Sequence, residues 1–313
     1  MPDVRTPLRP ILKWAGGKRQ LLPELRPFYP QGFRRYFEPF LGSGAVFLDL
    51  HNAGLLDGRE TRLSDINADI IGCYRAVRDE VEAVIAALRA HERDYTSAGG
   101  AHYYAVRDEV FNPVRRDLFG RPDPAGAYTP ELAAMLIFLN RTGFNGLFRL
   151  NARGAFNVPH GRHSAPRICD GENLRAWSRL LRRPGVQIEV CGFEAALERP
   201  GRGDFVYLDP PYAPLSATAR FTSYTAGGFD AEAQKRLQRD VLRLTARGAS
   251  ILLSNSAAPQ IRALYARDRR AVKAGLHAST VSARRAINSR ATSRGPVREY
   301  LITNVKPAAA KSL

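Results

Sequence analysis

The chain has 313 residues, of which 44% are hydrophobic and 25% charged, so it can bury one large core or two smaller ones. No apolar run approaches the roughly 18 residues of a membrane span. The segment 1–10 also lacks the apolar block of a signal peptide, so we expect a soluble, cytoplasmic protein without a membrane partner. The formal net charge of +17 predicts a polyanionic partner such as nucleic acid, although an arginine-rich codon bias would give the same number. The scattered Cys73, Cys169 and Cys191 argue against a disulfide framework or a metal cluster.

The first third of the chain predicts a cofactor site. Gly16-Gly17 allows a tight turn, after which Lys18 leads into a short helix that ends near Pro27. A short apolar strand at 36–40 is followed by the glycine-rich turn 42–44 and by a helix start. About 20 residues later a second strand ends at Asp65, where an acid commonly accepts hydrogen bonds from ribose hydroxyls. The third glycine of the dinucleotide fingerprint is missing, so the pattern predicts a nucleoside cofactor at the edge of an α/β sheet.

The middle of the chain predicts an inserted domain. Apolar residues recur at helical spacing over 67–93, and the alternation of strands and helices then lapses until about Arg183. Within this stretch we expect helices over 102–111 and 130–141. We therefore expect a catalytic domain over 8–75 and 184–305, an insert over 76–183, and a disordered tail over 306–313.

The centre of the insert, residues 140–162, predicts a hairpin with tight turns, because Asn-Gly and Arg-Gly pairs separate short aromatic runs. Arginine can bind guanine bidentately, asparagine can bind adenine, and aromatic side chains can wedge between bases. The stretch therefore suits DNA, although an ordinary polar loop remains an alternative. His160 and His163 have no acid or cysteine at metal spacing, so we expect no metal ion there.

Alternation resumes after the insert. We expect strands at 187–190, 205–208, 250–254 and 297–304, a helical turn at 193–197, and an amphipathic helix over 229–247. The arginine-rich stretch 281–298 is either a basic flap for phosphates or a solvated loop.

The most informative stretch is Asp209-Pro210-Pro211-Tyr212, which follows the apolar run 205–208. The prolines cannot donate to a sheet ladder, so the chain must leave the sheet rigidly there. This holds a carboxylate and an aromatic ring at the edge where α/β sheets bind their ligands. The arrangement suits a flat substrate that carries an amine.

Five ordered blocks carry a resemblance to a known family. They are LKWAGGK at 12–18, FEPFLGSG at 37–44, SDIN at 64–67, the block NRTGFNGL..LN..G.FNVP.G from Asn140 to Gly161, and DPPY at 209–212. The chain resembles the Dam-type, α-class (D12 group) DNA adenine-N6 methyltransferases over nearly its whole length. One departure is Gly192-Phe193, where many relatives carry an acid before the aromatic residue.

The resemblance implies a Rossmann-like, S-adenosylmethionine-dependent methyltransferase sheet with an inserted, mainly helical target-recognition domain that carries a β-hairpin. It implies an enzyme that methylates N6 of a flipped adenine in duplex DNA, in a GATC or other 5′-GA-containing site. We expect it to act as a monomer associated with the nucleoid.

The family's functional residues fall on named positions of this chain. Asp209, Pro210, Pro211 and Tyr212 are the expected catalytic residues. The expected cofactor contacts are Trp14, Ala15, Gly16, Lys18, Phe40, Gly42, Ser43, Gly44, Asp65 and Asp209, with Lys18 on the cofactor's carboxylate and Asp65 on its ribose. The expected DNA contacts are Phe144, Asn145, Leu147, Arg149, Asn151, Asn157, Arg162, Arg284, Arg285, Asn288 and Arg290. Among them Arg149 matches the arginine with which the family recognises guanine. The resemblance implies no requirement for a metal ion.

Three alternatives stay open at this point. An N4-cytosine DNA methyltransferase or an RNA adenine methyltransferase shares the chemistry, but the long insert and the basic flap favour duplex DNA. An inactive DNA-binding homologue would have no physical reason to keep Gly42, Asp65, Asp209 and Tyr212 together. Both a solitary methyltransferase and the partner of a restriction nuclease are compatible with these motifs.

Overall fold

The computed structural model describes residues 7–14, 16–213, 229–284 and 296–307. The chain divides into two compact units. The first unit comprises Met1–Gly17, Gly42–Leu55 and Asn67–Val190, and the second comprises Lys18–Leu41, Leu56–Ile66 and Cys191–Leu313. No helix among the described residues is both long and apolar enough to cross a membrane.

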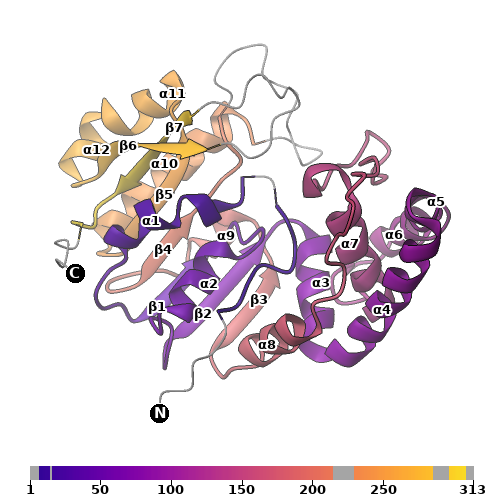
Figure 1. Ribbon diagram of the computed structural model, residues 1–313. Helices are drawn as coiled ribbons and strands as arrows, with labels where there is room; N and C mark the ends of the chain where they lie inside the picture. The colour runs from indigo at the N-terminus through magenta and orange to yellow at the C-terminus, as the bar shows by residue number, and fades with distance from the viewer. Residues whose placement is uncertain (1–6, 15, 214–228, 285–295, 308–313) are drawn as a thin grey trace. The chain divides into compact units, whose positions relative to one another are not determined.

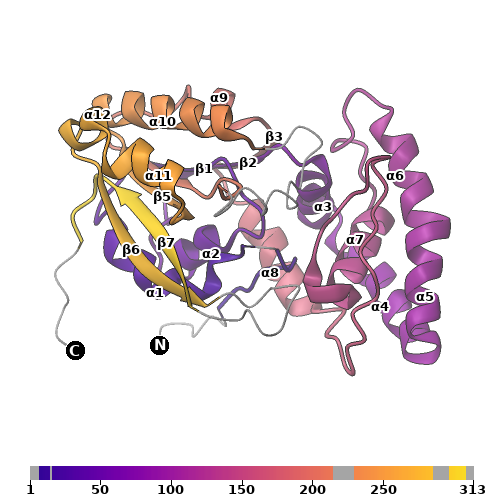
Figure 2. The same ribbon diagram turned by 90° about the horizontal axis from the view of Figure 1, so that it is seen from above.

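The strands form a mixed seven-stranded sheet, which confirms the α/β class. Six of them lie in the second unit in the order β2-β1-β4-β5-β7-β6. Their bounds are β1 Arg35–Glu38, β2 Glu60–Asp65, β4 Phe205–Leu208, β5 Ser250–Ser256, β6 His277–Arg284 and β7 Pro296–Thr303. Strands β2, β1, β4 and β5 are parallel, whereas β7 runs antiparallel to β5 and β6. Figure 2 shows β6 and β7 side by side.

The hairpin of β6 and β7 corrects the expectation for the basic flap. We expected a flap or solvated loop from residue 281, but the structure continues β6 to Arg284 and pairs it with Pro296. The sequence did not reveal β6 because its polar and small residues lack an apolar alternation.

The core of the second unit forms where alternate residues of the central strands meet α10, Ala231–Ala246. Strand β4 points Val206 and Leu208 into a fully buried cluster with Leu237 and Val241 of this helix. Phe205, on the opposite face of β4, instead packs against Tyr29 and Phe33 near the 3-10 turn η2, Arg26–Phe28. Because both faces are covered, β4 is buried throughout, and its carboxyl end is held firmly.

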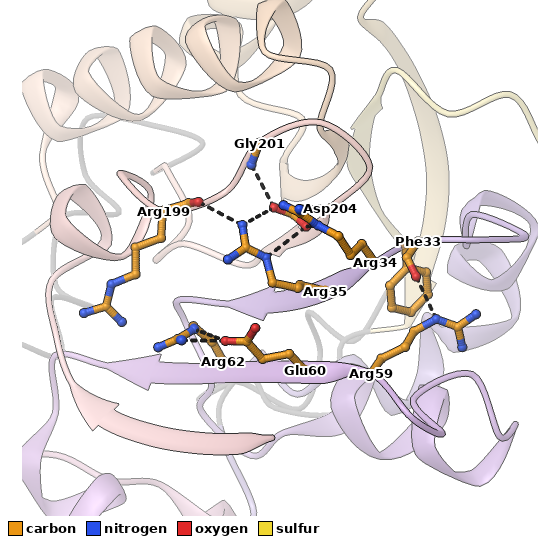
Figure 3. Close-up of polar contacts among 9 residues, drawn as sticks. All are labelled: Phe33, Arg34, Arg35, Arg59, Glu60, Arg62, Arg199, Gly201 and Asp204. Atoms are coloured by element: carbon orange, nitrogen blue, oxygen red, sulfur yellow. Dashed lines mark hydrogen bonds and ion pairs between the residues drawn. The ribbon is translucent and has the colours of Figure 1, made fainter. Parts of the chain in front are cut away.

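A buried ion-pair cluster fixes how β1 and β4 begin (Figure 3). The Asp204 side chain is fully buried and accepts hydrogen bonds from Arg35 at 2.6 Å, from Arg34 at 3.3 Å and from the backbone N–H of Gly201 at 2.8 Å. Burial alone would raise the pKa of Asp204, but these hydrogen bonds lower it below its usual value. The cluster ties the start of β1 to the turn before β4.

Short helices complete the second unit (Figure 1). They are η1 Lys18–Gln20, α1 Leu22–Leu25, α9 Phe193–Ala196, α11 Pro259–Ile261, η6 Arg262–Ala266 and α12 Arg269–Lys273. The sequence predicted η1, α1, α9 and α10 but not α11, η6 or α12, which are too short to show a helical period.

The first unit is mainly helical and carries the seventh strand, β3, Val186–Val190. Its helices are α2 Ala45–Asn52, α3 Ala68–Asp79, α4 Val81–Ala98, α5 Gly100–Ala105, η3 Val106–Phe111, α6 Asn112–Phe119, α7 Pro130–Thr142, η4 Phe144–Gly146 and α8 Gly171–Leu181. Helix α7 is buried on all sides from Leu132 to Asn140, so it forms the core around which α3 and α4 pack. The single helix expected over 67–93 is two helices, because Glu80 leaves the helical conformation between α3 and α4.

Candidate active site

Asp209 follows directly on the buried strand β4, and its carboxylate is held by two partners. Lys18 Nζ lies 2.8 Å from Asp209 Oδ1, and the Ser254 hydroxyl donates to the same oxygen at 3.1 Å. The Lys18 side chain is only 5% exposed, whereas that of Asp209 is 21% exposed. Both contacts fall on Oδ1, so the carboxylate has a fixed rotation, and Oδ2 has no hydrogen-bond donor among the described residues.

The electrostatics of Asp209 result from opposing effects. Burial raises the pKa of Asp209, the Lys18 ammonium opposes that rise, the nearby Glu299 carboxylate adds to it, and Ser254 lowers it again; the net direction is upward. A carboxylate in this setting is a strong hydrogen-bond acceptor when ionised, because little water competes for it.

Tyr212 is held at its hydroxyl and over its ring. The hydroxyl donates to Glu299 Oε2 at 2.6 Å, and Lys18 Nζ lies 4.6 Å from the ring centroid. Burial, then the charges of Asp209 and Glu299, raise the pKa of Tyr212 well above its usual value, so the phenol stays neutral.

The turn between Asp209 and Ala213 is fixed by the end of β5 and by α10. The Pro211 carbonyl accepts from Gln234 Nε2 at 3.1 Å, and the Ala213 N–H donates to Asn255 Oδ1 at 3.3 Å. The Ser256 hydroxyl donates to the Ala213 carbonyl at 2.6 Å. The Pro210 carbonyl receives no hydrogen bond from any described residue.

Two further predicted cofactor residues lie near this edge of the sheet. Asp65 is the last residue of β2. Strands β2 and β4 both run parallel to β1, so Asp65 at the end of β2 and Asp209 just after β4 lie at the same edge of the sheet. Phe40, just beyond β1, stacks on Phe193 with ring centroids 5.6 Å apart and meets Phe229 edge-on at 5.8 Å. Within the second unit, Asp65 and Asp209 therefore lie at the carboxyl-end edge of the sheet, with Lys18 on Asp209 and Phe40 just beyond β1.

The glycine-rich turn belongs to the first unit. Gly42 and Gly44 have positive φ values of 47° and 65°, and Gly44 begins α2. A Cβ at Gly42 would lie 2.9 Å from Trp14 Cδ1, so only glycine fits beside the indole. The Tyr74 hydroxyl donates to the Gly42 carbonyl at 3.0 Å, and this hydrogen bond ties the turn to α3. Ser43 is buried beside them, Gly16 is exposed, and Ala15 lies outside the described residues.

Residues 140–162 form a compact loop, not the regular hairpin that we expected. Two isolated bridges, Gly143 with His160 and Leu150 with Phe156, replace a continuous ladder. Asn151 forms the tip, where its Oδ1 accepts from the N–H groups of Arg153 at 2.9 Å and Ala155 at 3.0 Å.

The predicted DNA contacts of this loop lie near one another in the chain but differ in setting. Phe144 is 42% exposed, Asn145 has a strained φ of 53°, and Leu147 is partly buried. Arg149 is exposed and donates from Nε to Asn157 Oδ1 at 2.7 Å and from Nη2 to the Asn157 carbonyl at 3.1 Å. Arg162 also has a positive φ, of 52°. Arg284 ends β6, while Arg285, Asn288 and Arg290 lie outside the described residues.

Sequence comparison identifies the family. Residues 14–285 match the D12 class of N6 adenine-specific DNA methyltransferases. The Type II methyltransferase M1.LlaDCHI of Lactococcus lactis subsp. cremoris is 36% identical over 297 residues, which cover 95% of each chain. The DNA adenine methylase of Escherichia coli (strain K12) is 36% identical over 293 residues, which cover 94% of each chain. This chain belongs to the D12 class of N6 adenine-specific DNA methyltransferases.

The methyltransferase is thus an adenine-specific enzyme that uses S-adenosylmethionine, as the motifs led us to expect. Among solved structures, the rRNA methyltransferase aviRa from Streptomyces viridochromogenes aligns over 97% of this chain and 88% of its own, at 14% identity and a TM-score of 0.32. That likeness is too weak to carry an argument. In the described part of the methyltransferase, no group of three or more His, Cys, Asp or Glu side chains is arranged to hold a metal ion.

The sequence did not point to five side chains that hold residues 209–213 of the methyltransferase. They are Gln234, Ser254, Asn255, Ser256 and Glu299. A signal was present in β5, where three polar residues end an otherwise apolar strand and are all buried. Glu299 gave no such signal, because it precedes the apolar residues of β7 in an arginine-rich stretch.

Proposed function

We propose that this methyltransferase transfers a methyl group to N6 of an adenine flipped out of duplex DNA, in a site that contains 5′-GA, with GATC as the first candidate. The observation that carries the catalytic part is the geometry of Asp209. Lys18 and Ser254 both engage Oδ1, so Oδ2 is available to a substrate amine.

Asp209 and Pro210 would activate the amine. The lone pair of adenine N6 is delocalised into the ring, so the nitrogen is a poor nucleophile. Asp209 Oδ2 and the Pro210 carbonyl would accept the two N6 hydrogens and draw the nitrogen towards a tetrahedral geometry, and the proton that N6 must lose would point at these acceptors. Pro211 keeps the turn rigid, and Tyr212 would stack on the flipped base. Catalysis then comes from positioning and preorganised acceptors.

The residues present fit S-adenosylmethionine. Gly42 and Gly44 give the turn at 42–44 the positive φ values of a glycine-rich turn before a helix, the kind of turn that leaves room for a nucleoside cofactor, and Trp14 packs directly on Gly42. Asp65 would accept from the ribose hydroxyls, and Phe40 offers an aromatic face. We assign the remaining cofactor contacts to Gly16, Lys18, Ser43 and Gly44. When bound, S-adenosylmethionine supplies an electrophilic methyl group on a sulfonium ion.

Arg149 would read guanine in the DNA. Its Nε and one Nη2 hydrogen are directed to Asn157, so the terminal edge of the guanidinium can face outward. That edge matches the O6 and N7 acceptors of guanine. We propose that the neighbouring Phe144, Asn145 and Leu147 enter the opened duplex, with Phe144 already exposed.

We also propose that different parts of the chain carry catalysis and target recognition. Residues 8–75 and 184–305 would carry catalysis and residues 76–183 target recognition, in an enzyme that acts as a monomer. Asn151 and Arg162 would contact the DNA beside Arg149, and Arg284, Arg285, Asn288 and Arg290 would bind phosphates.

The experiment is methylation-sensitive sequencing of unmethylated DNA after treatment with the purified enzyme and S-adenosylmethionine. We expect N6-methyladenine in one short motif that contains 5′-GA. Methylation of N4-cytosine, or of adenines without a preceding guanine, would contradict the proposed site. Methylation of RNA in preference to duplex DNA would contradict the proposed substrate.

A further inference from the structure

We propose that Glu299 is a positioning residue for Tyr212: it fixes the tyrosine ring in the plane on which the flipped adenine stacks. The inference rests on the proposed role of Tyr212 as the stacking partner of the base. Glu299 lies outside every motif that identifies the family.

The hydrogen bond between the two residues is short and shielded. Tyr212 Oη lies 2.6 Å from Glu299 Oε2, and Glu299 is 7% exposed. A hydrogen bond to a charged acceptor is shorter and stronger than one between neutral groups. Glu299 therefore limits rotation of the phenol at the end of the ring opposite its Cβ.

The position of Glu299 is set by the sheet and does not depend on a mobile loop. Strand β7 pairs with both neighbours at this residue, Ser256 of β5 on one side and Val281 of β6 on the other. Ser256 also binds the Ala213 carbonyl, just after Tyr212. One strand register thus holds the tyrosine hydroxyl and the residue that follows the tyrosine.

One face of the Tyr212 ring lies against the Lys18 ammonium. Lys18 Nζ lies over the ring, 4.6 Å from its centroid, and also binds Asp209. A base would stack on the opposite face, with its amine directed at Asp209. The Glu299 charge disfavours the ionised form of Asp209, because it raises the pKa of Asp209. A second buried carboxylate beside the catalytic one is explained if it positions the ring.

The test is a double-mutant cycle on the full-length enzyme, with Glu299→Ala, Tyr212→Phe and both together. We expect each single variant to lose about tenfold in kcat, the size of effect for one lost hydrogen bond to a charged group. The double variant should lose no more than Tyr212→Phe alone, while KM for S-adenosylmethionine stays within about twofold. Glu299→Gln keeps an acceptor and should restore most of kcat. Glu194→Gln, which changes an exposed partner of Arg236 in the same unit, is the matched control and should behave as wild type.

A stacking readout completes the test. DNA with 2-aminopurine in place of the target adenine should fluoresce more strongly when saturated with Glu299→Ala than with wild type, because a misplaced ring quenches the flipped base less. Losses that multiply in the double variant, or wild-type kcat in Glu299→Ala, would overturn the inference. If Glu299→Ala does not fold, the cycle is run with Glu299→Leu in its place and the same outcomes decide, while Glu299→Gln remains the variant expected to restore kcat. Wild-type enzyme that forms no N6-methyladenine in duplex DNA would instead refute the proposed function itself.

Discussion

Lys18 and Asp209, which belong to motifs far apart in the chain, form an ion pair with Nζ 2.8 Å from Oδ1. The lysine is almost fully buried, so the pair is shielded from water. The resemblance to the family led us to expect Lys18 on the cofactor's carboxylate. The geometry adds a second role, in which the ammonium lowers the pKa of the Asp209 carboxyl against the effect of burial and fixes its rotation.

Lys18→Met separates these two roles. Asp209 must be ionised to accept hydrogens from N6, so kcat falls as pH drops through its pKa. Lys18 lowers that pKa, whereas burial and Glu299 raise it, so removal of the ammonium should move the acid limb of the kcat profile to higher pH. We expect kcat at pH 7 to fall about tenfold or more. Stopped-flow or quench-flow turnover across pH 5–9 measures this; an unmoved acid limb with much weaker S-adenosylmethionine binding would leave Lys18 only the cofactor role.

Arg149→Ala should relax sequence preference. Loss of a bidentate contact to guanine removes roughly 1–3 kcal/mol of discrimination at one base pair, while overall binding weakens less. Competition between the preferred site and sites with the guanine replaced gives the measurement. Unchanged discrimination would refute the assignment of Arg149.

Asn157→Ala should produce a milder form of the same defect. The guanidinium of Arg149 would lose the two acceptors that orient it, but the arginine itself would remain. We expect Asn157→Ala to prefer the guanine-containing site less strongly than wild type does and more strongly than Arg149→Ala does. The double variant should lose no more of this preference than Arg149→Ala alone. A loss in Asn157→Ala that adds fully to that of Arg149→Ala would mean that Asn157 contacts DNA independently.

Arg115→Ala should destabilise the first unit. Asp69 is 1% exposed and binds Arg115 at 2.8 Å, and Arg115 also donates to the Gly154 carbonyl in the loop 140–162. Removing one partner leaves a buried charge, at a cost of about 3–5 kcal/mol. Denaturant unfolding measures it, with Asp69→Leu/Arg115→Leu as the control that removes both charges and should be less harmful than the single change.

Arg35→Gln should lower stability at neutral pH and make stability depend less on pH. The pKa of Asp204 is depressed in the folded state, so this carboxylate stabilises the fold above its unfolded pKa and loses that effect as pH falls. Without Arg35 the depression shrinks, and the free energy of unfolding should fall by about 1–3 kcal/mol at pH 7, with a shallower decline towards pH 3. Thermal melts across this range decide; equal stability of the two proteins at pH 7 would contradict the role of the cluster.

The sequence predicted the strand ends that matter most, because an apolar run followed by an acid is a local signal. Asp65 and Asp209 both lie at the ends of parallel strands, as expected. Helix α8 was missed although Leu174, Trp177 and Leu181 repeat at helical spacing. The side chains that hold the tetrapeptide could not be predicted. Gln234 and Glu299 are far from it in the sequence and contact it only because α10 and β7 pack beside it in the fold.

The most direct test of Asp209 is nucleoside mass spectrometry of unmethylated duplex DNA treated with wild type, Asp209→Ala or Asp209→Asn. Wild type should yield N6-methyladenine, and both variants should yield none above background while S-adenosylmethionine still binds, as measured by calorimetry. Near-normal methylation by Asp209→Ala would contradict the central claim that this carboxylate activates the adenine amine.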